Sequence, residues 1–194
     1  MSAIKLIVFL VMYITLYASS KTHINSDASV MRIKNYNNFI ELHQSYSKMQ
    51  QLIMVNQYLN KLNFQTDAIN HNKSDYWATP EEFLSKGYGD CEDYVIIKYF
   101  SLLKFGFDID KLFVTIVKDK YTQRDHMVLS YFNDSNSAPL ILDNLSNEVL
   151  NLAQRKDLDI KAFINQEGVY KLKNDKLIKT TLTSKKFKEL LKRV

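Results

Sequence analysis

One stretch of the chain, residues 77–94, restricts what the sequence can fold into more than any other. It reads W-A-T-P-E-E-F-L-S-K-G-Y-G-D-C-E-D-Y and contains the only tryptophan, the only cysteine, two of the four glycines and one of the two prolines. Thr79 followed by proline and then by glutamate predicts a capped short helix, which Gly87 ends. Asp90 is predicted to cap a second helix that continues to about Phe105.

The lone cysteine falls at the first turn of that second helix. Unsatisfied N–H groups and the helix dipole at such a position favour a thiolate at Cys91. Gly89, just before the cap, is predicted to allow a close approach between the turn and the helix. A single cysteine has three possible roles: an inert buried thiol, an intermolecular disulfide or a nucleophile. Its setting favours the nucleophile.

The first 20 residues indicate an exported protein. Lys5 precedes a short apolar run over residues 6–17, and Ala18-Ser19-Ser20 supplies small residues suited to cleavage. This pattern is typical of a secretory signal peptide, and the run is short for a membrane span. We therefore expect a signal peptide at residues 1–20 and one domain over residues 21–194, with an uncleaved N-terminal anchor as the alternative.

Length and charge exclude some classes of protein. A chain of 194 residues is long enough for one domain with a substantial core. Its formal net charge of +5 is spread along the chain, and no nucleic-acid motif, repeat or phosphate-binding glycine loop accompanies it. A nucleic acid is therefore not an expected partner.

The rest of the chain predicts helices followed by an antiparallel sheet. An apolar stripe without glycine or proline predicts one long helix, or two with a slight bend, over residues 32–62. Branched and aromatic runs predict strands, and their connections are too short for crossover helices. These strands cover residues 112–117, 126–132, 140–142 and 169–172. A short helix is expected over 148–155, and a last helix is expected after Ser184.

Three side chains in this arrangement form a candidate catalytic set. Cys91 opens a helix, His126 opens a strand and Asp143 closes the next strand. The start of one antiparallel strand lies beside the end of its neighbour, so the histidine and the aspartate are expected to meet at one edge. A thiol, an imidazole and a carboxylate can then act as nucleophile, base and orienting group.

The segments W-A-T-P-E-E-F-L-S-K-G-Y-G-D-C-E-D-Y, D-H-M-V-L and L-D-N-L resemble the bacterial transglutaminase-like cysteine proteinases, most closely their periplasmic LapG-type members. The resemblance covers roughly residues 56–170. It implies an α+β, papain/transglutaminase-like fold, in which a central helix carrying the cysteine packs with N-terminal helices on an antiparallel sheet. It also implies that Cys91, His126 and Asp143 form a catalytic triad.

The same resemblance implies a calcium ion near the cysteine. The acids at the matching positions are Asp90, Glu92 and Asp93. Carboxylates around a thiol should raise its pKa, and Ca²⁺, which prefers oxygen ligands, would neutralise them. The alternative is that these acids only cap the helix and complement its dipole.

The resemblance further implies a periplasmic endopeptidase that cuts a large surface adhesin near its N-terminal retention module and so controls biofilm attachment. A cyclic-di-GMP-responsive inner-membrane receptor is an implied partner. Two alternatives stay open from the residues alone. One is an acyltransferase or amidase of the same fold that acts on cell-wall peptide, and the other is a binding module without catalysis.

Overall fold

The structure is a computed structural model that describes residues 26–66, 76–134, 137–173 and 176–194. The predicted signal peptide at residues 1–20 lies outside the described residues. Within the described ranges, no helix combines the length and the apolar character that crossing a membrane would require.

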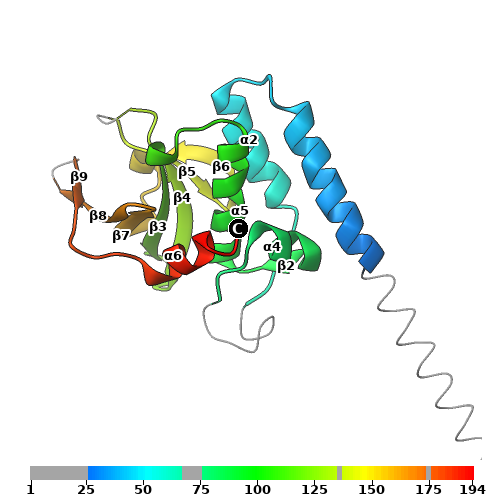
Figure 1. Cartoon of the computed structure of the whole chain (residues 1–194). Helices are drawn as coiled ribbons and strands as arrows, with labels where there is room; N and C mark the ends of the chain where they lie inside the picture. Colours follow the sequence, from blue (N-terminus) through cyan, green and yellow to red (C-terminus); the bar gives the residue numbers. More distant parts are fainter. Residues whose placement is uncertain (1–25, 67–75, 135–136, 174–175) are drawn as a thin grey trace, which may run out of the picture.

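The N-terminal part forms a hairpin of two helices (Figure 1). Residues 26–42 are helical, the chain turns over residues 43–47, and helix α2 (Lys48–Leu59) follows. The prediction of a helix with at most a slight bend is wrong here. Ser47 and Gln50 form a capping box that starts a new helix, so the chain reverses without glycine or proline. Phe39 stacks on Tyr58, with their ring centroids 4.2 Å apart, and joins the two helices.

The segment around the cysteine folds as its sequence predicts. Helix α4 (Pro80–Lys86) begins at a capping box of Thr79 and Glu82, and Gly87 follows it in the left-handed conformation with φ of 79°. A short strand β2 (Tyr88–Gly89) pairs in parallel with β1 (Asn63–Phe64). Helix α5 (Cys91–Lys104) then begins with Asp90 as its N-cap residue.

Seven strands form one antiparallel sheet in the order β6-β5-β4-β3-β7-β8-β9. They are β3 (Leu112–Asp119), β4 (Asp125–Tyr131), β5 (Leu140–Asp143), β6 (Ser146–Asn151), β7 (Leu158–Asn165), β8 (Gly168–Lys173) and β9 (Lys176–Lys179). Short 3₁₀ helices η1 (Ile109–Lys111) and η2 (Leu152–Gln154) precede β3 and follow β6. The predicted meander of β3, β4 and β5 is confirmed.

Two parts of the sheet region differ from the prediction or extend it. The helix expected over residues 148–155 is wrong, because strand β6 occupies most of that range and pairs with β5. A two-residue turn at Asn144 and Leu145 folds β6 back, and this pairing overrides the local helical pattern. Strands β7 and β9 were not predicted. The last helix α6 (Lys185–Leu191) is capped by Ser184, as predicted.

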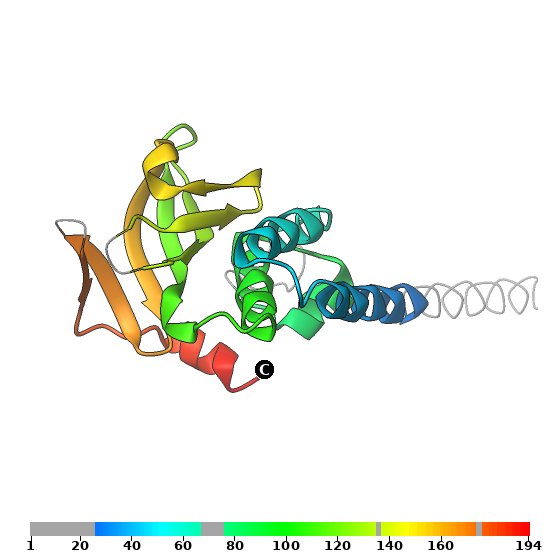
Figure 2. The same cartoon turned by 90° about the horizontal axis from the view of Figure 1, so that it is seen from above.

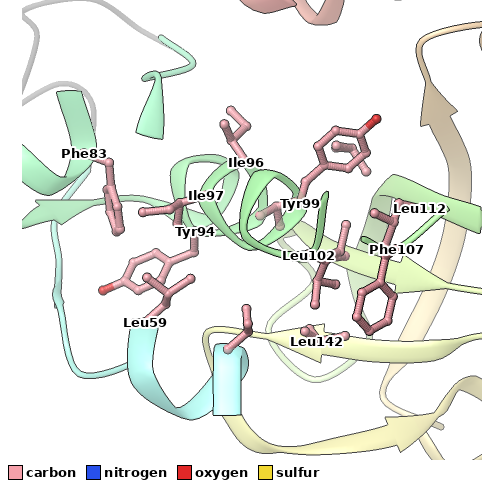
Figure 3. Packing of buried hydrophobic residues seen from close by; sticks show 14 of the residues in the cluster. Leu59, Phe83, Tyr94, Ile96, Ile97, Tyr99, Leu102, Phe107, Leu112 and Leu142 are labelled. Atoms are coloured by element: carbon pink, nitrogen blue, oxygen red, sulfur yellow. The ribbon is translucent and has the colours of Figure 1, made fainter. Parts of the chain in front are cut away.

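Helix α5 lies at the centre of the molecule, between the sheet and the other helices (Figure 2). It packs on β3 and β4, while α2 contacts both α5 and β6. Figure 3 shows side chains of α2, α4 and β5, among them Leu59, Phe83 and Leu142, converging on α5. A helix buried on nearly all sides is held in place along its whole length. The architecture is the α+β arrangement predicted from the sequence, with the cysteine at the start of its most buried helix.

Candidate active site

The start of helix α5 is fixed by its own acidic side chains. The Asp93 carboxylate accepts a hydrogen bond from the Ala78 N–H at 2.8 Å and one from the Asp90 N–H at 3.4 Å. A Cβ atom on Gly89 would lie 2.4 Å from Asp93 Oδ2 and 2.7 Å from the ring of Phe83. Only glycine fits this position without displacing a neighbour, so the close approach predicted at Gly89 is confirmed.

The Cys91 thiol is partly buried beside acids. Its Sγ donates a hydrogen bond to Glu92 Oε2 at 3.1 Å. Burial raises the pKa of the Cys91 thiol, and the negative charges of Glu92 and Asp90 raise it further, while a hydrogen bond from the backbone N–H of Met127 acts in the opposite direction. Burial and these acids together therefore outweigh the preference for a thiolate that its place on the helix suggests.

The sheet register brings the candidate histidine and aspartate together. Leu129 of β4 pairs with Leu142 of β5, so Asp143 follows at the end of β5 and lies diagonally across from His126 at the start of β4. His126 Nε2 is 2.8 Å from Asp143 Oδ1. Because the N–H of Met127 reaches Cys91 Sγ, the thiol lies at the residue that follows His126. His126 of β4 therefore contacts Asp143 of β5, and the residue after His126 contacts the thiol of α5.

Asp143 is fully buried and held by donors on every side. Its Oδ1 also accepts the Leu145 N–H at 2.9 Å, and its Oδ2 accepts Arg155 Nη2 at 2.7 Å. Burial alone would raise the pKa of Asp143. The hydrogen bond and charge of His126, with the bonds from Leu145 and Arg155, outweigh burial and hold that pKa well below its usual range. The group is thus a carboxylate at neutral pH.

Sequence analysis missed Arg155. This side chain is 8% exposed and lies between Asp143 and Asp157, with Nη2 2.7 Å from an oxygen of each carboxylate. Burial alone would lower the pKa of Arg155, but its bonds to the two aspartates raise it. No local pattern marks the residue, since it follows a 3₁₀ turn at a place where a helix was expected. Only the pairing of β5 with β6 brings it to Asp143.

Other notable residues of the sequence do not join this group. Trp77 is buried against Phe187, with ring centroids 6.4 Å apart, and so belongs to the core. His43 lies in the turn of the N-terminal hairpin, where its Nδ1 is 2.6 Å from the Phe39 carbonyl oxygen. His23 and His71 lie outside the described residues. Asn144 lies in the turn between β5 and β6.

The three acids predicted to hold calcium differ in their contacts. Asp93 uses both carboxylate oxygens on backbone N–H groups, which indicates a structural role at the helix start. Glu92 accepts the hydrogen bond of the Cys91 thiol, and both Glu92 and Asp90 are buried. In the part of the chain that the structure describes, no group of three or more His, Cys, Asp or Glu side chains is placed to hold a metal ion. The chemistry of the donors still fits Ca²⁺, because this ion prefers hard oxygen ligands and the carboxylates of Asp90 and Glu92 are both buried at the helix start.

Comparisons with known proteins place the chain in a family. The family model for the bacterial transglutaminase-like cysteine proteinase, BTLCP, matches residues 26–162. The chain therefore belongs to this family of cysteine proteinases. None of the curated proteins matches it.

Solved structures of one protein resemble it over most of its length. The calcium-bound LapG of Legionella pneumophila is 32% identical, with a TM-score of 0.77, and the match covers 90% of this chain and 97% of that one. The EGTA-treated LapG of the same organism is 35% identical, with a TM-score of 0.73, and the match covers 85% and 89% of the two chains. The chain thus has the LapG-like, transglutaminase-like fold.

Proposed function

We propose that this chain is a cysteine endopeptidase in which Cys91 is the nucleophile, His126 the general base and acid, and Asp143 the group that orients the imidazole. The observation that carries the proposal is the 2.8 Å contact of His126 with Asp143, in a member of a cysteine proteinase family in which the backbone N–H of the next residue, Met127, bonds the Cys91 thiol. A buried carboxylate on one ring nitrogen fixes the tautomer and the direction of the other.

The proposal gives each side chain a step in the reaction. Asp143 holds Nε2 of His126, so Nδ1 is the nitrogen that accepts the thiol proton. The sulfur of Cys91 then forms a bond to the carbonyl carbon of the substrate. His126 returns the proton to the leaving amine as the C–N bond breaks. A water molecule, deprotonated by His126, cleaves the thioester and restores the thiol.

We further propose that Asp90 and Glu92 hold a calcium ion, with Asp93 supporting them. The bound ion would supply positive charge beside the thiol. In the present arrangement the thiol proton points to Glu92, which competes with His126 for it. If the ion bound the Glu92 carboxylate, His126 would be left as the acceptor of the thiol proton. The similarity to calcium-bound and EGTA-treated structures of LapG supports this role.

The substrate, location and partner follow from the resemblance to LapG-type proteases. We propose a periplasmic enzyme, exported by the signal peptide at residues 1–20, that cuts a large surface adhesin near its N-terminal retention module. A cyclic-di-GMP-responsive inner-membrane receptor is the proposed regulatory partner.

Mapping new protein N-termini tests the reaction. Residues 21–194 are incubated with calcium and an extract of host envelope proteins, and new N-termini are labelled and sequenced. Wild type should create new N-termini within an adhesin, and Cys91→Ala should create none. Retained cleavage by Cys91→Ala overturns the proposal. Cleavage confined to cell-wall peptide, or transfer of the acyl group to an added amine, replaces it with the amidase or the acyltransferase.

A further inference from the structure

A lysine is buried inside the molecule two turns along α5 from the nucleophile. Lys98 has no exposed surface. It is seven residues from Cys91, so both side chains leave the same face of the helix. Burial of an ammonium group is costly, and its position therefore needs an explanation.

The contacts of Lys98 lead to the turn that presents Asp143. Its Nζ donates to Asn56 Oδ1 of helix α2 at 2.7 Å. Asn56 Nδ2 in turn donates to the carbonyl oxygen of Ser146 at 2.7 Å. One turn further along α2, Asn60 Nδ2 donates to the carbonyl oxygens of Asp143 and Ser146 at 2.8 and 2.9 Å. Both ends of the β5–β6 turn are thus bound by amides of α2.

The charge of Lys98, like these bonds, links α5 to Asp143. Burial lowers the pKa of Lys98 to about 7, while the negative charge of Asp143 favours its ionised form. The cation also lies 5.8 Å from the centre of the Tyr94 ring. Lys98 therefore links the helix that carries the thiol, through α2, to the strand end that carries the aspartate.

We propose that Lys98, Asn56 and Asn60 are positioning residues that fix the Asp143 turn against helix α5 and thereby set how His126 faces Cys91. This inference rests on the proposed function for its catalytic meaning. It goes beyond the triad because none of the three residues reaches the reacting atoms. They act through the backbone of Asp143 and Ser146.

A paired substitution separates positioning from simple burial. Lys98→Met with Asn56→Leu replaces both partners of a buried hydrogen bond by apolar groups of similar shape. The Ser146 carbonyl oxygen loses Asn56 as a donor but keeps Asn60, so the melting temperature should stay near that of wild type. If Lys98 serves only to satisfy a buried contact, this double variant should keep the kcat and KM of wild type. If the residues position Asp143, kcat should fall by about tenfold to hundredfold, with KM changed by less than about twofold. The substrate is the protein cut in the N-terminal mapping experiment.

A spectroscopic measurement makes the test independent of the reaction. In ¹⁵N-labelled protein, the ring N–H proton of His126 bonded to Asp143 should give a far-downfield resonance. We expect it to shift or broaden in the double variant. Ser101→Ala is the matched control, because Ser101 is another buried polar residue of α5 but bonds Tyr36. It should lower the melting temperature and leave the resonance and kcat unchanged.

Asn60→Ala keeps the inference testable if the double variant does not fold. Asn60 is only partly buried at the end of α2, and its loss removes the direct bond to the Asp143 carbonyl. The resonance should shift in the same way. An unchanged resonance and kcat in Asn60→Ala, or in the folded double variant, overturns the inference. Failure of Cys91→Ala to abolish cleavage overturns only the proposed function, since the resonance reports the His126–Asp143 bond whatever the reaction is.

Discussion

Asp143 is the residue at which most polar contacts of the site meet. Its side chain bonds His126, Arg155 and the Leu145 N–H, and its carbonyl accepts Asn60. A fully buried carboxylate without partners would be protonated and could not orient an imidazole. These donors keep it ionised and restrict its rotation. Activity should therefore depend on residues that never touch the substrate.

Arg155→Met tests that dependence. The variant removes the donor to Asp143 Oδ2 and should lower kcat by about tenfold or more, with a smaller change in KM, because the carboxylate gains freedom to turn away from His126. Steady-state kinetics on the mapped substrate measure it. Lys161→Met, which removes an exposed ion pair with Asp159 on β7, is the control and should leave kcat unchanged. Equal kinetics for wild type and Arg155→Met would contradict the role of Arg155.

The lowered pKa of Asp143 predicts how stability depends on pH. A carboxyl group whose pKa is lower in the folded chain binds fewer protons there than in the unfolded chain. Its contribution is fully present above the unfolded pKa of about 4 and is lost as the pH falls through the folded pKa. Urea unfolding of wild type and Asp143→Asn should show a difference in free energy that is largest near pH 6 and shrinks towards pH 3. A difference that stays constant over this range would contradict the assignment.

At the scale of elements, the sequence predicted those helix ends that are decided by neighbouring residues. The caps at Thr79 and Asp90 and the stop at Gly87 gave the bounds of α4 and α5, because each satisfies terminal groups within a few residues. The same approach failed at residues 148–155, where pairing with β5 decides the conformation.

The site divides in the same way. Cys91, His126 and Asp143 stand at element ends that the sequence marks. Arg155, Lys98 and Asn56 carry no such mark. Arg155 and Asn56 reach the site from other elements, whereas Lys98 lies inside α5, and the bonds that define their roles connect residues 12, 42 and 90 positions apart. Contacts of this kind depend on the assembled fold and not on a local pattern.

Gly89→Ala tests the close approach between β2 and α5. The new Cβ would meet Asp93 and Phe83, so the helix start must shift, and we expect a loss of about 1–3 kcal/mol in unfolding free energy together with reduced activity. Gly106→Ala is the control. It has open space around its Cβ but a φ of 75°, so it should lose about 1 kcal/mol from strain and keep its kcat. Full activity in Gly89→Ala would contradict the inference that the close approach at Gly89 fixes the start of α5.

At the scale of the whole molecule, the site joins three parts: a buried helix carrying the thiol, a sheet carrying His126 and Asp143, and a second helix that connects them. Acids gather at the start of α5, whereas the buried cations Lys98 and Arg155 lie on the side of Asp143. The Asp143 side is therefore balanced by positive groups of the chain itself. Glu92 bonds the Cys91 thiol, and the proposed calcium ion would supply positive charge on that side.

That imbalance predicts how calcium changes the stability of the whole chain. Suppose that an ion binds only the folded state and is present at a concentration of about 100 times its Kd. It then adds about 2.7 kcal/mol to the unfolding free energy, which raises the melting temperature by several degrees. Wild type should show this rise in calcium and lose it in EGTA. Glu92→Gln should show little rise, and it should be more stable than wild type in EGTA because a buried charge is removed. Glu81→Gln, an exposed acid of α4, is the control and should respond like wild type.

The rate of Cys91 alkylation by iodoacetamide links the ion to the thiol. In wild type, labelling should be fast in calcium and slow in EGTA, since the acids beside the thiol are neutralised only in calcium. Glu92→Gln should label at similar rates in both, because the charge nearest the sulfur is absent. A wild-type protein whose melting temperature and labelling rate are the same in calcium and in EGTA would rule out the calcium site and leave the cysteine proteinase assignment intact.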